Sequence, residues 1–149
     1  MTFPTNLRHF RATEFGGYAD QMDTELLYWL DDIRDRLGMR LNVTSSGRPY
    51  QLNAAVNGYQ NSLHIPKPIT GLVRAVDVQT GAMDARDAAT IPADNFLVSR
   101  AACWDVRPYG RRAEVICESR AGVWHWHLGL FPASDTRPSR FTIIRKDAQ

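Results

Sequence analysis

Apolar and polar positions along the chain predict one long helix near the N-terminus. Leucine and isoleucine side chains recur at three- and four-residue steps between Asp23 and Leu37, which is the spacing of one helix face. Asp23 is a suitable N-cap, and Glu25 complements the helix dipole in the first turn. Gly38 follows as a natural C-cap. We therefore expect a helix from Asp23 to Leu37.

Most of the other patterned segments predict short strands. They are residues 40–46, 72–78, 106–109, 113–117, 123–130 and 141–144. Residues 50–70 read as a long loop with a short helix at 53–56, and two further helices are expected at 83–89 and 95–103. Helices followed by strands that loops separate indicate an α+β fold. We expect a small, largely antiparallel sheet flanked by helices.

Composition adds limits to this picture. The chain has 149 residues and a formal net charge of +2. This length is typical of one soluble domain, which would span residues 1–149. We also expect a monomer. The arginines are spread along the chain, so we expect no nucleic-acid partner. No apolar run is long enough to cross a membrane. The spacing of Cys103 and Cys117 fits neither a zinc knuckle nor a redox pair, and two reduced thiols are favoured over a disulfide.

The N-terminal residues carry no apolar segment typical of a signal peptide. We therefore expect the protein to be made in a cytoplasm without such a peptide. If it acts on a cell wall, another component must bring it there.

Histidines are the clearest candidates for chemistry. The chain has four, and His125 and His127 lie two apart in a predicted strand, so their side chains share one face. Taken alone, this pair is as consistent with a polar solvent face as with a metal site. Asp77, between two valines, also has a plain interpretation as a strand-end cap. His9 is expected to be structural, beside Phe10.

Several motifs in a fixed order give these residues more meaning. They are His9-Phe10, Glu14-Phe15, the predicted helix, Ser45-Ser46-Gly47-Arg48-Pro49, Asn53 to Gly58, Asn61-Ser62-Leu63-His64, Ala75-Val76-Asp77 and Trp126-His127-Leu128. This order resembles the zinc D-Ala-D-Ala carboxypeptidase and L-Ala-D-Glu endopeptidase family, metallopeptidase family M15, to which many phage endolysins belong. The resemblance implies a hedgehog/DD-peptidase-like fold. It covers the first half of the chain and one later strand.

The resemblance also implies a site. His64, Asp77 and His127 match the family's zinc ligands, and an open fourth position would hold water. Arg48 matches the turn arginine, which would bind a substrate carboxylate or stabilise the negative charge of the transition state. Ser62 would hydrogen-bond substrate. The plain alternatives are a surface ion pair for Arg48 and a loop-shaping role for Ser62.

Two departures from the family pattern concern the gap between ligands and the catalytic base. Twelve residues separate His64 from Asp77, more than the family pattern has, so residues 65–72 look like an insertion. Trp124 stands where many members have an acidic general base. His125 is the first replacement candidate, because related enzymes with two histidines in one strand use the first in this way and histidine titrates near neutrality. Glu118 and Asp105 are further candidates.

These observations predict a zinc-dependent hydrolase that cuts an amide bond of peptidoglycan stem or cross-link peptides, as a phage endolysin or virion lysin. One alternative is a non-catalytic, degenerate relative that binds the wall or serves as a structural phage component. Another is an α+β binding module with scattered histidines. The sequence leaves the cleaved bond open.

Overall fold

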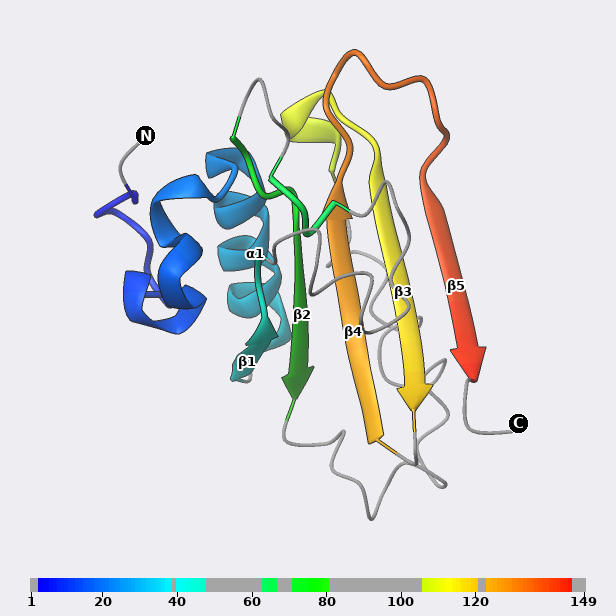
Figure 1. Cartoon of the computed structure of the whole chain (residues 1–149), viewed down its shortest axis with the longest axis horizontal. Helices are drawn as coiled ribbons and strands as arrows, with labels where there is room; N and C mark the ends of the chain where they lie inside the picture. The colour runs from blue at the N-terminus through cyan, green and yellow to red at the C-terminus, as the bar shows by residue number, and fades with distance from the viewer. Residues whose placement is uncertain are drawn as a thin grey trace.

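The computed structural model describes residues 3–38, 40–47, 63–66, 71–80, 106–120 and 123–145. In chain order the elements are η1 (Ala12–Gln21), α1 (Thr24–Leu37), β1 (Leu41–Ser45), β2 (Ala75–Thr80), η4 (Arg107–Tyr109), β3 (Ala113–Arg120), β4 (Val123–Leu130) and β5 (Arg140–Arg145). The two N-terminal helices lie at the side of the sheet formed by β1 and β2, and β5 forms the opposite edge (Figure 1). No helix in these described ranges is long and apolar enough to span a membrane.

Helix α1 has the limits that its sequence predicts. The Asp23 carboxylate accepts hydrogen bonds from the backbone N–H groups of Glu25 and Leu26, at 3.0 and 3.4 Å. At the other end Gly38 adopts a left-handed conformation with φ 67°, and its N–H donates to the Arg34 carbonyl at 3.2 Å. A glycine suits this position because it has no Cβ. The buried face consists of Leu26, Leu27, Trp29, Leu30, Ile33 and Leu37.

The sheet has the strand order β1-β2-β4-β3-β5. The pairs β1·β2, β2·β4 and β3·β4 are antiparallel, whereas β5 runs parallel to β3. The prediction of an α+β fold with a largely antiparallel sheet is therefore confirmed, and β5 is the exception within it.

The two faces of the sheet differ in chemistry because side chains alternate along each strand. One face packs on α1 and contributes to the main core through Val76, Val78, Ala113, Val115, Cys117, Trp126, Leu128 and Leu130. The intervening positions of β2, β3 and β4 form the opposite face, which we call the polar face. Its residues include Ala75, Asp77, Gln79, Glu114, Ile116, Glu118, His125, His127 and Gly129.

Two predicted strands are corrected by the structure. Residues 106–109 do not form a strand, because Arg107–Tyr109 is a 3₁₀ turn closed by the Tyr109 N–H donating to the Val106 carbonyl at 3.0 Å. Pro108 has a fixed φ that suits this turn. The strand predicted at 72–78 begins only at Ala75, since Val73 bonds instead to the segment between η1 and α1.

Other element predictions have mixed outcomes. Strands 40–46, 113–117, 123–130 and 141–144 are confirmed as β1, β3, β4 and β5, within a few residues at their ends. The predicted helices at 53–56, 83–89 and 95–103 lie outside the described residues. Helix η1 was not predicted, because its two consecutive glycines interrupt any helical pattern, and Gly16 has a φ of 61° within it.

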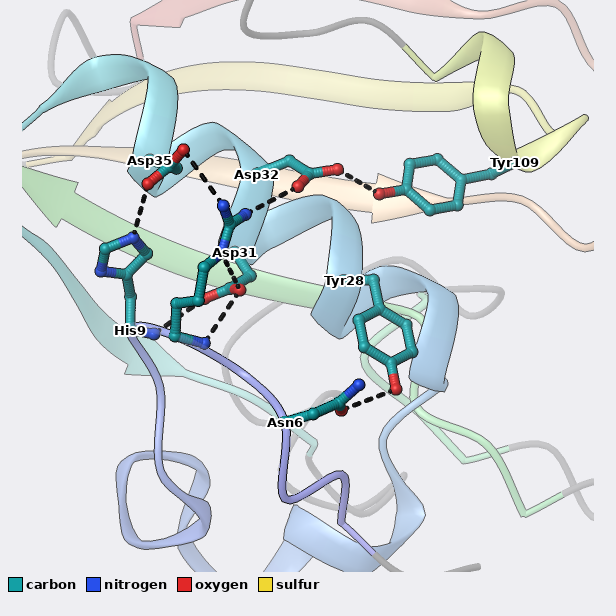
Figure 2. Close-up of polar contacts among 8 residues, drawn as sticks. Asn6, His9, Tyr28, Asp31, Asp32, Asp35 and Tyr109 are labelled. Carbon is teal, nitrogen blue, oxygen red and sulfur yellow. Dashed lines mark hydrogen bonds and ion pairs between the residues drawn. The ribbon is translucent and has the colours of Figure 1, made fainter.

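The N-terminal segment is fastened to α1 by charged side chains, and we call this contact the N-terminal clamp (Figure 2). The Arg8 guanidinium bonds to Asp31, Asp32 and Asp35 at 3.0–3.3 Å. The His9 ring lies 3.0 Å from the Asp35 carboxylate. His9 thus has a structural contact, as the sequence predicts.

Candidate metal centre

Three side chains that are far apart in the sequence meet on the polar face. His64 Nε2 lies 3.1 Å from Asp77 Oδ1 and 3.2 Å from His127 Nδ1. His127 Nδ1 lies 3.3 Å from the same Asp77 oxygen. The three atoms therefore form a nearly equilateral triangle. A tetrahedral ion with ligands at about 2.0–2.1 Å requires ligand–ligand distances of roughly 3.3–3.4 Å, so the triangle has the right size.

Strand pairing places two of these residues side by side. Asp77 in β2 is the direct cross-strand partner of His127 in β4. Directly opposite residues of an antiparallel pair project from the same face with their Cβ atoms about 4.5–5.5 Å apart. The register alone therefore brings the carboxylate and the imidazole together.

His64 reaches the same place from a turn rather than from a strand. Its neighbour Leu63 is buried against Ala75 and Phe131, and the Leu63 carbonyl accepts a hydrogen bond from the Arg74 N–H at 2.8 Å. The His64 side chain is 1% exposed. The long spacing between His64 and Asp77 thus does not keep their side chains apart.

The Ser46 carbonyl fixes the other side of the His64 ring. This oxygen lies 2.6 Å from His64 Nδ1, while the Ser46 hydroxyl donates to the Phe15 carbonyl at 2.7 Å. The next residue is Gly47, and a Cβ at this position would lie 2.4 Å from the Tyr18 ring. The Ser-Gly turn therefore needs its glycine in order to pack against η1 while its serine carbonyl holds His64.

The partners of both rings assign their protons. A carbonyl oxygen only accepts, so His64 Nδ1 carries its hydrogen and Nε2 is left with a lone pair. His127 Nε2 lies 2.7 Å from Glu114 Oε1, and a carboxylate that accepts there leaves the lone pair on Nδ1. When both rings are neutral, two imidazole lone pairs and a carboxylate oxygen face one another in a buried space. That arrangement is repulsive unless a proton or a metal ion lies between the atoms.

The pKa shifts have the same electrostatic origin. Burial works against the charge of Asp77, but hydrogen bonds from His127 and His64 outweigh it and hold the Asp77 pKa far below its usual range. For His127, burial lowers the pKa, yet hydrogen bonds to Asp77 and Glu114 together raise it to about 9. The carboxylates thus favour positive charge at this position, whether a proton or a metal ion supplies it.

Comparison with models of known protein families shows to which family this chain belongs. The family model described as Peptidase M15 matches residues 6–97, which is more than half of the chain. The chain belongs to the peptidase M15 family. Searches of the curated proteins and of the solved structures found no match. Membership in this family points to a metallopeptidase.

The matched segment of this M15 peptidase contains His64 and Asp77 but ends before β4. The assignment of His127 to the same cluster as His64 and Asp77 therefore rests on the geometry of the sheet. The β2–β4 register supplies what the family match does not cover.

His125, the candidate base, lies on the same strand and face as His127. Its Nε2 is 3.1 Å from Glu118 Oε2, and Glu118 is its direct cross-strand partner in β3. Glu118 is thus a partner of His125. Asp105, Arg48 and Ser62 lie outside the described residues, as does Cys103, while Cys117 is buried on the α1 side of the sheet.

Two residues of this M15 site were missed in the sequence. Glu114 contacts His127, and the Ser46 carbonyl contacts His64. The alternating pattern Glu114-x-Ile116-x-Glu118, which begins in the strand predicted at 113–117, is a usable signal, since a strand that continues to Glu118 places both carboxylates on one face. The backbone carbonyl of Ser46 leaves no mark in the sequence.

Proposed function

We propose that this M15 peptidase is a zinc enzyme that hydrolyses an amide bond in the stem or cross-link peptides of peptidoglycan. The observation that carries the proposal is the triangle of metal-facing atoms from His64, Asp77 and His127. Two imidazoles and one carboxylate form a donor set that suits catalytic zinc.

The roles of the residues follow from their positions. His64 Nε2, an Asp77 carboxylate oxygen and His127 Nδ1 would hold the ion. When bound, zinc supplies a Lewis acid that polarises the scissile carbonyl and makes a water molecule more acidic. His125, on the same face of β4, would accept a proton, and the Glu118 carboxylate at 3.1 Å would stabilise its charged form.

Two further residues are proposed from the motif resemblance. Arg48 would bind a substrate carboxylate or the charge that develops on the carbonyl oxygen, because a guanidinium forms paired hydrogen bonds with oxyanions. Ser62 would hydrogen-bond the peptide. The support for Arg48 in the structure is the neighbouring Ser46, whose carbonyl contacts His64.

Mass spectrometry of purified sacculi tests the substrate. The zinc-loaded protein should release or convert muropeptides, and the mass differences will identify the bond that is cut. His127→Ala should release nothing, whereas His9→Ala should retain activity because His9 contacts Asp35 and not the metal-facing group. Binding to sacculi without any product would instead support the non-catalytic alternative.

A place in phage lysis is the finer part of the proposal. Its support is the resemblance to phage endolysins. Production of the protein inside bacteria whose inner membrane has been permeabilised should cause lysis, and His127→Ala should abolish this effect. Activity on soluble peptides with none on intact sacculi would contradict a role at the wall.

A further inference from the structure

Strand β3 provides each histidine of β4 with a carboxylate partner. Glu114 Oε1 lies 2.7 Å from His127 Nε2, and Glu118 Oε2 lies 3.1 Å from His125 Nε2. Glu118 is directly opposite His125, while Glu114 is one diagonal step from His127. Both carboxylates are on the polar face and largely buried, with 17% and 13% of their side chains exposed. These pairs are therefore built into the sheet.

The Glu114 contact has a direct consequence for the metal-facing group. A histidine that offers Nδ1 to a metal must carry its proton on Nε2. A carboxylate at 2.7 Å from Nε2 accepts that proton's hydrogen bond and stabilises this tautomer over the other. The same bond fixes the rotation of the ring about its Cβ–Cγ bond, so Nδ1 stays directed at Asp77.

Glu114 is not placed to act as the base. The two nitrogens of an imidazole point to opposite sides of the ring, so a carboxylate bonded to Nε2 is separated from the Nδ1 side by the ring itself. The second oxygen of Glu114 faces Arg140 at 3.6 Å. Glu114 is thus held between an arginine and His127, which suits a fixed orienting role.

We propose that Glu114 is a positioning residue that holds His127 in the tautomer and orientation required to bind the metal through Nδ1. This inference rests on the proposed metal site. It extends that site from β2 and β4 to β3, which lies outside the matched family segment.

Zinc affinity, measured by competition with a chromophoric chelator, tests the role without any activity assay. Glu114→Ala should weaken zinc binding by about 10–100-fold, the usual effect of removing such a partner. Glu114→Gln keeps the shape but loses the charge, and should give a smaller loss. Glu118→Gln is the matched control, because it changes the same group on the same strand beside a histidine that is not in the triangle. Its zinc affinity should equal that of the unchanged protein.

Nitrogen-15 NMR of the histidine rings in the zinc-loaded protein gives a second readout. In the unchanged protein, His127 should carry its proton on Nε2. Zinc affinity in both Glu114 variants equal to that of the unchanged protein would overturn the inference but leave the metal site intact. A proton on Nδ1 of His127 would also overturn the inference. Failure of the unchanged protein to bind zinc would contradict the proposed function and the inference with it. Melting curves of the metal-free variants identify any that fail to fold, and Glu114→Gln then decides.

Discussion

The two faces of the sheet use the same strands for different purposes. The face toward α1 is apolar and joins the core through side chains such as Val76, Val115 and Leu128. The polar face carries acids and histidines at the alternate positions of the same strands, among them Asp77, Glu114 and His127. Because a strand alternates its side chains, each strand residue of the site is flanked by residues of the core.

This comparison shows how the protein combines a stable apolar scaffold with a cluster of buried titratable side chains. Burial of apolar area on the α1 side stabilises the sheet. That stability holds the metal-facing atoms of the polar face within 3.1–3.3 Å of one another, where neutral imidazoles and the carboxylate would repel unless a proton or a metal ion lay between them. Damage to one face should therefore have a different signature from damage to the other.

The largest effect should come from removing a metal-facing histidine. His127→Ala should abolish peptide hydrolysis and weaken zinc binding by more than about 100-fold, since even indirect partners of a metal cost 10–100-fold. His125→Ala should retain zinc and lose activity. Zinc content by elemental analysis and turnover of muropeptides measure the two properties. Full activity of His125→Ala would show that the base lies elsewhere.

The next largest effect should come from shortening a buried side chain that packs on the apolar face of the sheet. Leu30→Ala should lower the free energy of unfolding by about 2–5 kcal/mol, because Leu30 is completely buried on α1 and its loss leaves a cavity. Denaturant unfolding measures this change. The folded fraction should still bind one zinc ion per chain. A loss of zinc without a loss of stability would contradict the division between the two faces.

A smaller effect on stability and zinc binding is expected at the Ser46-Gly47 turn, which contacts both η1 and His64. Gly47→Ala places a Cβ against the Tyr18 ring and should cost about 1–3 kcal/mol of stability through overpacking. It should also weaken zinc binding, because the Ser46 carbonyl must move away from the His64 ring. Gly17→Ala is the control, since its Cβ would meet nothing within 4 Å. Equal behaviour of the two variants in unfolding and zinc titration would contradict this role for the turn.

The smallest effect concerns pH and the N-terminal clamp. A hydrogen bond from His9 and the charge of Arg8 lower the pKa of Asp35. A carboxyl group whose pKa is lowered by folding stabilises the fold above its unfolded pKa, and this contribution is lost as the pH falls through its folded pKa. Hydrogen exchange of residues 3–11 should therefore rise below about pH 4, the ordinary range of aspartate. Asp35→Asn should show raised exchange already at neutral pH, and an unchanged pH profile in that variant would argue against the clamp.

The sequence predicts the parts of the fold that are determined locally. Helix α1 follows from its apolar spacing and its caps, and β4 follows from the alternation of Trp126 and Leu128 with histidines. The sequence wrongly predicts a strand at residues 106–109, where the turn Arg107–Tyr109 lies, because four residues are too few to distinguish a turn from a strand by periodicity. The parallel pairing of β5 with β3 depends on contacts between distant segments, which the local pattern does not contain.

The candidate site likewise has residues that the sequence identifies and others that only the three-dimensional structure identifies. The family motifs bring His64, Asp77 and His127 to attention, and the structure places them together. Glu114 was overlooked because an acid in an alternating strand is normally a solvent-facing residue. Its partner becomes visible only through the β3–β4 register.

Anomalous diffraction at the zinc edge, from a crystal of the zinc-loaded protein, addresses the central claim most directly. The account predicts one strong peak between His64 Nε2, Asp77 and His127 Nδ1, at about 2.0–2.2 Å from each ligand atom. The peak should disappear in His64→Ala. A peak elsewhere in the molecule, or no peak in a crystal grown with stoichiometric zinc, would contradict it.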